Sequence, residues 1–213
     1  MDRKQHWEDV YSRKKPNEVS WYQAEPTVSL NIVNEAAGAS QAAVIDVGGG
    51  TSTLVDRLVD QPAMEITVLD ISGAALREAQ SRLGAKAARV KWIEADILDV
   101  ELPEAGYDVW HDRAVFHFLT EAGDRRRYLE QVSRSVRIGG HVLVATFDAD
   151  GPRKCSGLEV ARYSPDELHA QFGRAFRLLR SVHENHVTPM GTTQRFVYCL
   201  CVVEGPSRVR HAA

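Results

Sequence analysis

A glycine-rich turn and an acid that follows it are the residues of this chain best suited to chemistry. The stretch Ala43-Val-Ile-Asp-Val-Gly-Gly-Gly-Thr-Ser52 is an apolar run that breaks into glycines, and the next apolar run, 66–69, ends in Asp70. Gly48 and Gly50 let the backbone pass close to a ligand and turn amide N–H groups toward it. An acid at the end of the neighbouring strand can accept hydrogen bonds from both hydroxyls of a ribose. Together the two segments predict a nucleoside pocket.

The residues around the turn distinguish this pocket from a dinucleotide site. The dinucleotide fingerprint G-x-G-x-x-G has a third glycine where this chain has Thr53. Asp46 stands two residues ahead of the turn, where its charge would repel a pyrophosphate. The pattern D-x-G-x-G therefore favours a cationic nucleoside without phosphates, such as S-adenosylmethionine, with Asp46 acting through water or backbone amides on its charged amino-acid end. The alternative is a glycine turn that only connects a strand to a helix; Asp70 argues against it.

Strand and helix patterns alternate along the chain, which predicts a mostly parallel sheet. The expected strands are 44–47, 65–70, 89–94, 107–112, 141–147, 176–183 and 195–203. The expected helices are 51–59, 72–83 with Ser72 as N-cap, 121–136 closed by Gly139-Gly140, and one that starts at Ser164. The last two strands follow each other without a helix and should form an antiparallel hairpin. The predicted fold class is α/β, a Rossmann-like sheet of seven strands with helices on both faces, in one domain over residues 1–213.

These motifs resemble the class I S-adenosylmethionine-dependent methyltransferases, over roughly residues 7–203. In open α/β sheets, ligands bind outside the carboxyl ends of the strands. The resemblance implies that Asp70 holds the ribose, that Asp96 accepts from the adenine amino group, and that Ile71 and Ile97 flank the ring. The cofactor-binding residues that it implies are Trp21, Asp46, Gly48, Gly50, Asp70, Ile71, Asp96, Ile97, Asp112 and Arg113. The alternative for each acid is that it only forms part of the turn after a strand, because Asp is common where strands turn into loops.

Aromatic residues gather ahead of the first strand. Trp7 and Tyr11 are followed by Trp21 and Tyr22, and the pattern W-x-x-x-Y…S-W-Y resembles the N-terminal arm of small bacterial methyltransferases and of some protein-lysine methyltransferases. Residues 1–26 are expected to form a lid arm, whose ring faces can hold a sulfonium by cation–π attraction. The alternative for Trp7 and Tyr11, which are spaced i and i+4, is a purely structural role in which their rings pack a helix against the sheet.

The methyl acceptor is less clear from the sequence. The [ND]-P-P-[YF] signature of enzymes that act on amide or nucleobase nitrogens is absent after the fourth strand, where Asp112-Arg-Ala-Val-Phe-His-Phe118 stands. His117 and Asp112 are the candidate catalytic residues, His117 as a general base with an ordinary pKa of about 6.5. A buried histidine that packs on the following helix is the alternative. Asp112 or Asp148 can instead bind a cationic amine, and the polar excursion 147–158 is expected to roof the acceptor side.

Composition narrows the class of protein further. The chain has 213 residues, a formal net charge of −3 and a pI near 6.2, so nothing in it indicates general attraction to nucleic acid. It shows neither a secretory h-region nor an apolar run of the roughly 18 residues that span a bilayer. Its three cysteines do not form a disulfide framework, and we expect no metal site, a cytoplasmic location and a frayed tail at 204–213.

The sequence therefore predicts an enzyme that uses S-adenosyl-L-methionine, leaves S-adenosylhomocysteine as product and methylates a small-molecule acceptor. Neither nucleic acid nor membrane is an expected partner. Two alternatives stay open: a protein-lysine methyltransferase, and a binding protein that keeps the pocket without catalysis.

Overall fold

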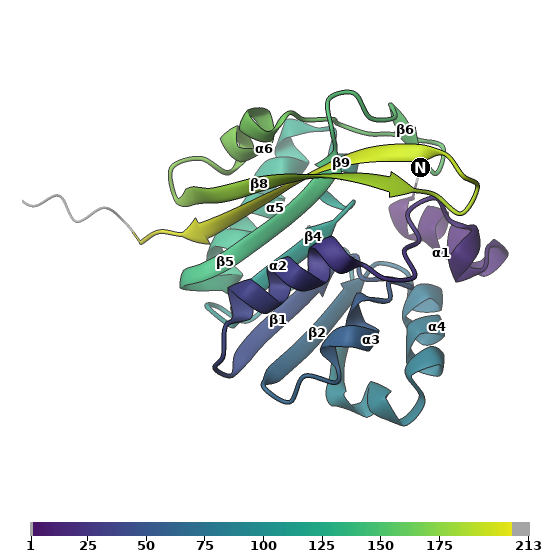
Figure 1. The fold of residues 1–213 in the computed structure, drawn as a ribbon, viewed down its shortest axis with the longest axis horizontal. Coiled ribbons are helices and arrows are strands. Elements are labelled where there is room, and N and C mark those ends of the chain that lie inside the picture. The colour runs from purple at the N-terminus through teal and green to yellow at the C-terminus, as the bar shows by residue number, and fades with distance from the viewer. Residues whose placement is uncertain (1, 206–213) are drawn as a thin grey trace, which may run out of the picture.

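A seven-stranded sheet in the order β3-β2-β1-β4-β5-β9-β8 forms the centre of the computed structural model, which describes residues 2–205 (Figure 1). Neighbouring strands pair in parallel from β3 to β5, whereas β9 is antiparallel to both β5 and β8. The strands are β1 (Ala42–Val47), β2 (Met64–Asp70), β3 (Val90–Glu94), β4 (Tyr107–Arg113), β5 (Val136–Phe147), β8 (Phe176–Val187) and β9 (Thr193–Val203). The predicted fold class is confirmed. Most of the predicted tail, 206–213, lies outside the described residues.

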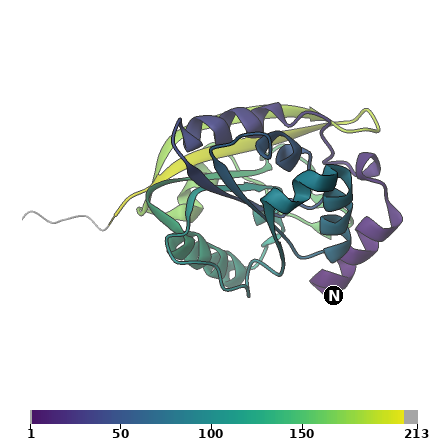
Figure 2. The ribbon, with the colours of Figure 1, turned by 90° about the horizontal axis from the view of Figure 1, so that it is seen from below.

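Helices cover both faces of this sheet. Figure 2 shows α2 (Thr27–Ala37) on one side and α5 (Ala122–Ser135) on the other. Apolar residues of α3 (Leu54–Leu58) and α4 (Gly73–Leu83) pack in the same buried cluster as those of α2, and residues of α6 (Pro165–Phe172) pack with those of α5. Because side chains alternate along a strand, each central strand feeds both clusters.

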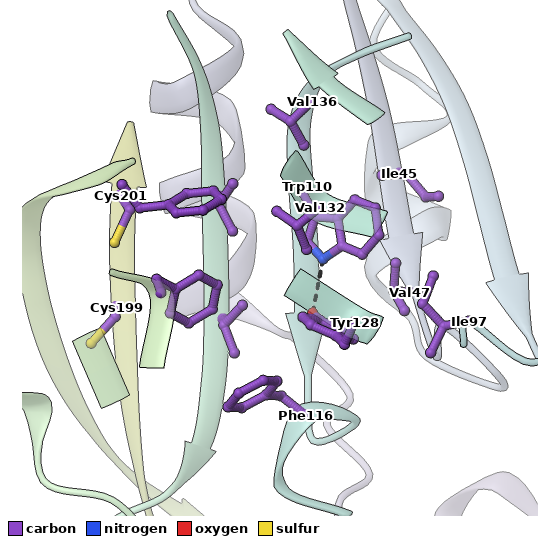
Figure 3. Packing of buried hydrophobic residues seen from close by; sticks show 14 of the residues in the cluster. Ile45, Val47, Ile97, Trp110, Phe116, Tyr128, Val132, Val136, Cys199 and Cys201 are labelled. Atoms are coloured by element: carbon purple, nitrogen blue, oxygen red, sulfur yellow. Dashed lines mark hydrogen bonds between the residues drawn. The ribbon is translucent and has the colours of Figure 1, made fainter. Parts of the chain in front are cut away.

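Strand β4 illustrates this alternation. Val109 belongs to the α2 cluster, whereas Trp110 is fully buried against α5. There the indole Nε1 of Trp110 donates to the hydroxyl of Tyr128 at 2.9 Å, the dashed line in Figure 3. From Val109 to Asp112 the odd-numbered residues therefore face α2 and the even-numbered ones face α5, whereas Tyr107, before the register shift of β4, packs in the α5 cluster.

Several predicted element boundaries are confirmed by their capping contacts. The Ser72 hydroxyl accepts from the Ala75 amide at 3.2 Å, and α4 ends at Gly84 with φ of +57°. The helix that starts after Ser164 has the expected capping box, in which Glu167 Oε2 accepts from the Ser164 amide at 2.8 Å. Local side-chain chemistry fixed these ends, because each contact lies within three residues.

Other boundaries differ from the prediction. Helix α5 ends at Ser135, one residue before the predicted end at 136, and the glycines at 139–140 lie within β5 instead of closing the helix, because Val136 pairs with Tyr107 and starts β5. Helix α3 has five residues instead of the predicted nine at 51–59, and β8 continues to Val187. Pairing between strands, which is not visible in local sequence, sets the start of β5 and the end of β8.

The N-terminal region contains two helices, α1 (Arg3–Arg13), which the i, i+4 spacing of Trp7 and Tyr11 had left open as an alternative, and α2, which the sequence patterns did not predict. Helix α1 stands apart from the sheet beside α4 (Figure 1), where Glu8 accepts from the Gly73 amide at 2.6 Å. The excursion after β5 contains a small antiparallel pair, β6 (Lys154–Cys155) and β7 (Leu158–Glu159). No helix in residues 2–205 has the length and apolar character that crossing a membrane requires.

Candidate functional site

The glycine turn lies at the carboxyl end of β1 and forms one wall of a pocket. Gly48 has φ of +66°, and a Cβ there would lie 2.0 Å from Val115 Cγ2. Gly50 has φ of +46°, and a Cβ there would lie 2.8 Å from the Tyr11 hydroxyl and 3.0 Å from Asp70 Oδ2. Only glycine fits these two positions without strain. The amides of Gly48 and Gly49 donate to Leu69 O at 2.7 and 3.2 Å, so these two groups are not turned toward a ligand as expected.

The acid that ends β2 is buried at the floor of this pocket. Asp70 is 5% exposed, and its Oδ1 accepts from the Ser72 amide at 2.8 Å. Burial raises the pKa of Asp70 to about 7, against the opposing effect of the Ser72 hydrogen bond. Beside it, Ile71 and Ile97 also line the pocket, as an adenine site would require.

The next acid, Asp96, lines the same pocket at the mouth. Its Oδ1 accepts from the Leu98 amide at 2.9 Å, and its Oδ2 lies 3.5 Å from Arg3 Nη1 on α1. Arg3 is also paired with Asp124. Helix α1 therefore reaches over the side of the pocket that the sequence assigns to adenine.

Aromatic rings from the N-terminal arm roof the pocket. Trp7, Tyr11 and Trp21 all line it, together with Phe118 from the segment after β4. Trp7 contacts Trp21 and Phe118 edge to face, with ring centroids 5.8 and 5.0 Å apart. Trp7 and Tyr11 thus do more than fasten α1, because their rings form pocket surface.

A second, more polar recess adjoins the other side of the glycine turn. Asp46 lines it, and Asp46 Oδ1 lies 2.7 Å from His111 Nδ1. His111 Nε2 lies 2.9 Å from the hydroxyl of Ser29 on α2. Asp46 Oδ2 is buried and has no hydrogen-bond partner among the residues that the structure describes.

Arg113 borders both the pocket and the recess. Its Nε donates to the Tyr198 hydroxyl at 2.9 Å, and its Nη1 donates to the carbonyl of Trp21 at 3.1 Å. The guanidinium lies 4.2 Å from the centroid of the Phe196 ring, a cation–π contact. Its Nη2 is 3.6 Å from Glu184 Oε2 and forms no hydrogen bond within the described residues.

The structure turns Asp112 away from the pocket, contrary to the sequence prediction. Asp112 is fully buried on the α5 face, where its carboxylate accepts from Tyr128 Oη at 2.6 Å and from the amides of Val115 and Phe116. Burial raises the pKa of Asp112 to about 6, and the Tyr128 bond opposes that rise. Its position two residues from Trp110 on the same strand explains the direction. We therefore withdraw Asp112 as a cofactor-binding or catalytic residue.

The structure also places His117 outside the pocket lining, where the sequence had predicted a general base. Its side chain is fully buried between the rings of Phe118 and Phe147, with centroids 4.4 and 4.8 Å away. Burial, together with the nearby charge of Arg113, lowers the pKa of His117 to about 3. An imidazole that is enclosed in this way and does not line the pocket is unsuited to be a general base. His117 therefore matches the alternative given for it from the sequence, a buried histidine that packs within the fold.

The excursion after β5 supplies the remaining wall, as expected. Cys155 and Leu158 from the β6–β7 pair line the pocket together with Leu119. Burial raises the pKa of the Cys155 thiol to about 11, so it stays uncharged. Asp148, the other candidate for an amine, is buried and lies 2.6 Å from His183 Nδ1 and 3.1 Å from Arg195 Nε, and it does not line this pocket.

Sequence reasoning missed His111 and Ser29. His111 could have been found from strand parity, since it alternates with Trp110 and Asp112 and therefore faces the opposite side. Ser29 has no such signal, because its partner is far away in the chain. The pocket has a cavity volume of about 150 Å³.

Comparisons with known proteins agree with this geometry. A family model described as a methyltransferase domain matches residues 44–140. An uncharacterized methyltransferase of Mycobacterium tuberculosis is 36% identical over 104 residues, which make up 49% of this chain and 50% of that protein. A eEF1A lysine and N-terminal methyltransferase of Bos taurus is 24% identical over 144 residues, 65% of this chain and 20% of that protein. The chain thus spans about half the length, or less, of these curated relatives.

Solved structures show the same fold. One, concerned with the conversion of a disulfide bond into a thioacetal group during echinomycin biosynthesis, has a TM-score of 0.76 at 19% identity and covers 96% of this chain and 94% of that chain. Another, N-methyltransferase NodS from Bradyrhizobium japonicum in complex with S-adenosylhomocysteine, has a TM-score of 0.70 at 13% identity, with 93% and 98% covered.

Proposed function

Because this chain belongs to the class I S-adenosylmethionine-dependent methyltransferases, with S-adenosylmethionine as the methyl donor, we propose that it methylates a small-molecule acceptor. The observation that carries the proposal is the roofed pocket at the carboxyl ends of β1, β2 and β4, with acids on one side and apolar rings on the other. We propose a cytoplasmic location as well, consistent with three free cysteines.

The acids and the glycine turn fit the cofactor. In our proposal Asp70 accepts from the ribose hydroxyls, and Asp96 accepts from the adenine amino group once it is released from Arg3. Ile71 and Ile97 flank the adenine ring, and Gly48 and Gly50 keep the turn clear of it. The unpartnered Asp46 Oδ2 is suited to the α-ammonium of the methionine part, and Arg113 Nη2 to an anionic group beside it.

The opposite wall fits an uncharged or anionic acceptor. In the described part of the chain, the acids that line the pocket are Asp70 and Asp96, both on the adenosine side. The wall beyond the ribose is formed by apolar and aromatic side chains, with Arg113 as its nearest charge: Trp7, Trp21, Phe118, Leu119, Cys155 and Leu158. A lysine ammonium would lose its hydration there without a counter-charge, which is costly. This supports a small apolar molecule over a lysine side chain.

Methyl transfer from a sulfonium is an in-line displacement, which mainly requires alignment and exclusion of water. The rings of Trp7, Tyr11 and Trp21 can serve both needs, since they cover the pocket and offer π faces to a cation. With Asp112 and His117 turned away, this chain offers no general base at the acceptor wall in the described residues. An acceptor that arrives deprotonated, such as a thiolate or a neutral amine, needs none.

The proposal is tested by methyl transfer into a cell lysate. Purified protein is incubated with lysate and labelled S-adenosylmethionine, and the products are divided by size. We expect label in the small-molecule fraction, and less label with the Asp70→Ala variant when the cofactor is not saturating, because its cofactor affinity is weakened. Label confined to protein would overturn the small-molecule acceptor and favour the protein-lysine alternative that the eEF1A methyltransferase relative represents. Cofactor binding without any transfer would instead favour a non-catalytic binding protein.

A further inference from the structure

Three buried polar side chains from three separate elements form one chain of hydrogen bonds behind the glycine turn. Asp46 ends β1, His111 lies opposite it on β4, and Ser29 lies in α2. The two links measure 2.7 Å from Asp46 Oδ1 to His111 Nδ1 and 2.9 Å from His111 Nε2 to Ser29 Oγ. All three residues are at most 3% exposed, so water does not compete for these bonds.

The direction of the hydrogen bonds follows from the donors and acceptors present. A carboxylate oxygen only accepts, so His111 Nδ1 carries the hydrogen in its bond to Asp46. The other ring nitrogen then has a free lone pair and accepts from the Ser29 hydroxyl. Asp46 therefore sets the tautomer of His111, Ser29 holds the orientation of the imidazole ring, and His111 in turn fixes the rotation of the Asp46 carboxyl group.

This rotation determines where the second carboxylate oxygen points. With Oδ1 bound to His111, Asp46 Oδ2 is beside the glycine turn, 2.9 Å from the position of a Cβ on Gly49, and Asp46 lines the polar recess. Oδ2 has no partner among the described residues. A buried acceptor left unpaired is unfavourable, and a cationic ligand group would satisfy it with a charge-assisted hydrogen bond.

We propose that Ser29 and His111 are positioning residues that hold Asp46 Oδ2 toward the α-ammonium of the cofactor. The inference rests on the proposed function and deepens it, because it assigns the recess to the amino-acid end of the ligand and extends the site to a helix of the N-terminal region. The same region carries Gln23, whose carbonyl accepts from Thr53 Oγ1 at 2.8 Å. Residues 23–29 are thus joined at two points to the residues that flank the glycine turn.

Two ligands separate this role from a general structural one. S-Adenosylhomocysteine contains the α-amino-acid end, whereas 5′-methylthioadenosine keeps the nucleoside and lacks that end. Calorimetric affinities for both are measured with the wild-type protein and with Ser29→Ala, His111→Asn and His111→Leu. Ser135→Ala is the matched control, because Ser135 is also buried and its hydroxyl has no partner in the described chain.

The expected result is a loss that depends on the amino-acid end. His111→Leu should weaken S-adenosylhomocysteine by about tenfold or more, the size of one hydrogen bond to a charged group, and change 5′-methylthioadenosine by less than about twofold. His111→Asn, whose amide can still donate to Asp46, should recover part of the loss. Ser29→Ala should show a smaller loss of about threefold, and Ser135→Ala should match the wild type.

Equal losses for both ligands, or no loss for S-adenosylhomocysteine, would overturn the positioning role. Ser29→Ala leaves the bond between His111 and Asp46 in place and decides the matter if His111→Leu does not fold. Failure of the proposed function looks different, since the wild-type protein would then bind neither ligand.

Discussion

The hydroxyl of Tyr128 on α5 donates a 2.6 Å hydrogen bond to the carboxylate of Asp112 at the end of β4. The same hydroxyl accepts from the indole of Trp110 (Figure 3). The three side chains therefore form one buried polar group within the core. Asp112 also accepts from the amides of Val115 and Phe116. It therefore holds the backbone directly after β4 in place.

Asp112→Ala should therefore reduce stability rather than ligand binding. Removing the carboxylate leaves buried donors unpaired, which costs about 1–3 kcal/mol. Urea unfolding of the variant should show this loss, while its calorimetric affinity for S-adenosylhomocysteine stays within about twofold of the wild type. If Asp112→Ala instead greatly weakened S-adenosylhomocysteine binding and left the free energy of unfolding unchanged, Asp112 would take part in cofactor binding.

Asp70 should control affinity for the nucleoside. Asp70→Ala is expected to weaken S-adenosylhomocysteine by about 1–3 kcal/mol, because the ribose loses hydrogen bonds to a charged group. Unchanged affinity would mean that the ribose lies elsewhere. Asp60→Ala is a suitable control, since that exposed acid pairs with Lys86 and does not line the pocket.

Binding should also depend on pH through Asp70, whose pKa burial raises to about 7. The ribose hydroxyls bind the ionised carboxylate better, so below pH 7 a proton must be released on binding. Affinity for 5′-methylthioadenosine, which lacks the titrating amino-acid end, should be several-fold weaker at pH 6 than at pH 8. In Asp70→Asn the two affinities should agree; a pH dependence that persists there belongs to another group.

His117 should affect the stability of the fold as a function of pH. Burial lowers its pKa to about 3, whereas in the unfolded chain the pKa is about 6.5. Between these two pKa values the unfolded state binds more protons than the folded state. The contribution of the neutral His117 to the free energy of unfolding is therefore fully present above pH 6.5 and is lost as the pH falls toward 3. Relative to His117→Leu, the wild type should lose up to about 1.4 kcal/mol per pH unit below pH 6 in urea unfolding. Parallel pH curves for the two proteins would contradict this assignment.

Helix α1 should slow the release of the cofactor. Glu8 on α1 accepts from the amides of Gly73 and Ala74 at the start of α4, next to the ring of Trp7 over the pocket. Glu8→Ala should detach this end of α1 and raise the dissociation rate of S-adenosylhomocysteine several-fold in stopped-flow tryptophan fluorescence, since carboxylate bonds at a helix N-terminus contribute about 1 kcal/mol. Asp9→Ala is the control, because among the residues that the structure describes the Asp9 side chain bonds to Gln5 and Arg13, both within α1. Equal dissociation rates for both variants would show that Glu8 does not hold the lid.

Local sequence was sufficient for the features that depend on neighbouring residues. The glycines at 48 and 50, the caps at Ser72 and Ser164, and the alternation of strands and helices each rest on contacts or periods that span a few positions. The predicted sheet and the cofactor class followed from them. The same patterns also predicted an acid at the end of β2 and another just after β3. These acids, Asp70 and Asp96, both line the pocket.

Contacts between distant elements settled the rest. Asp112 and His111 are neighbours in sequence, yet they face opposite sides of β4, and only the packing of α2 and α5 shows which side holds the recess. The partners of the two side chains, Ser29 and Tyr128, come from helices 82 and 16 residues away. Strand parity relates side chains to one another but does not say which face meets the ligand; that choice depends on how the helices close over the sheet.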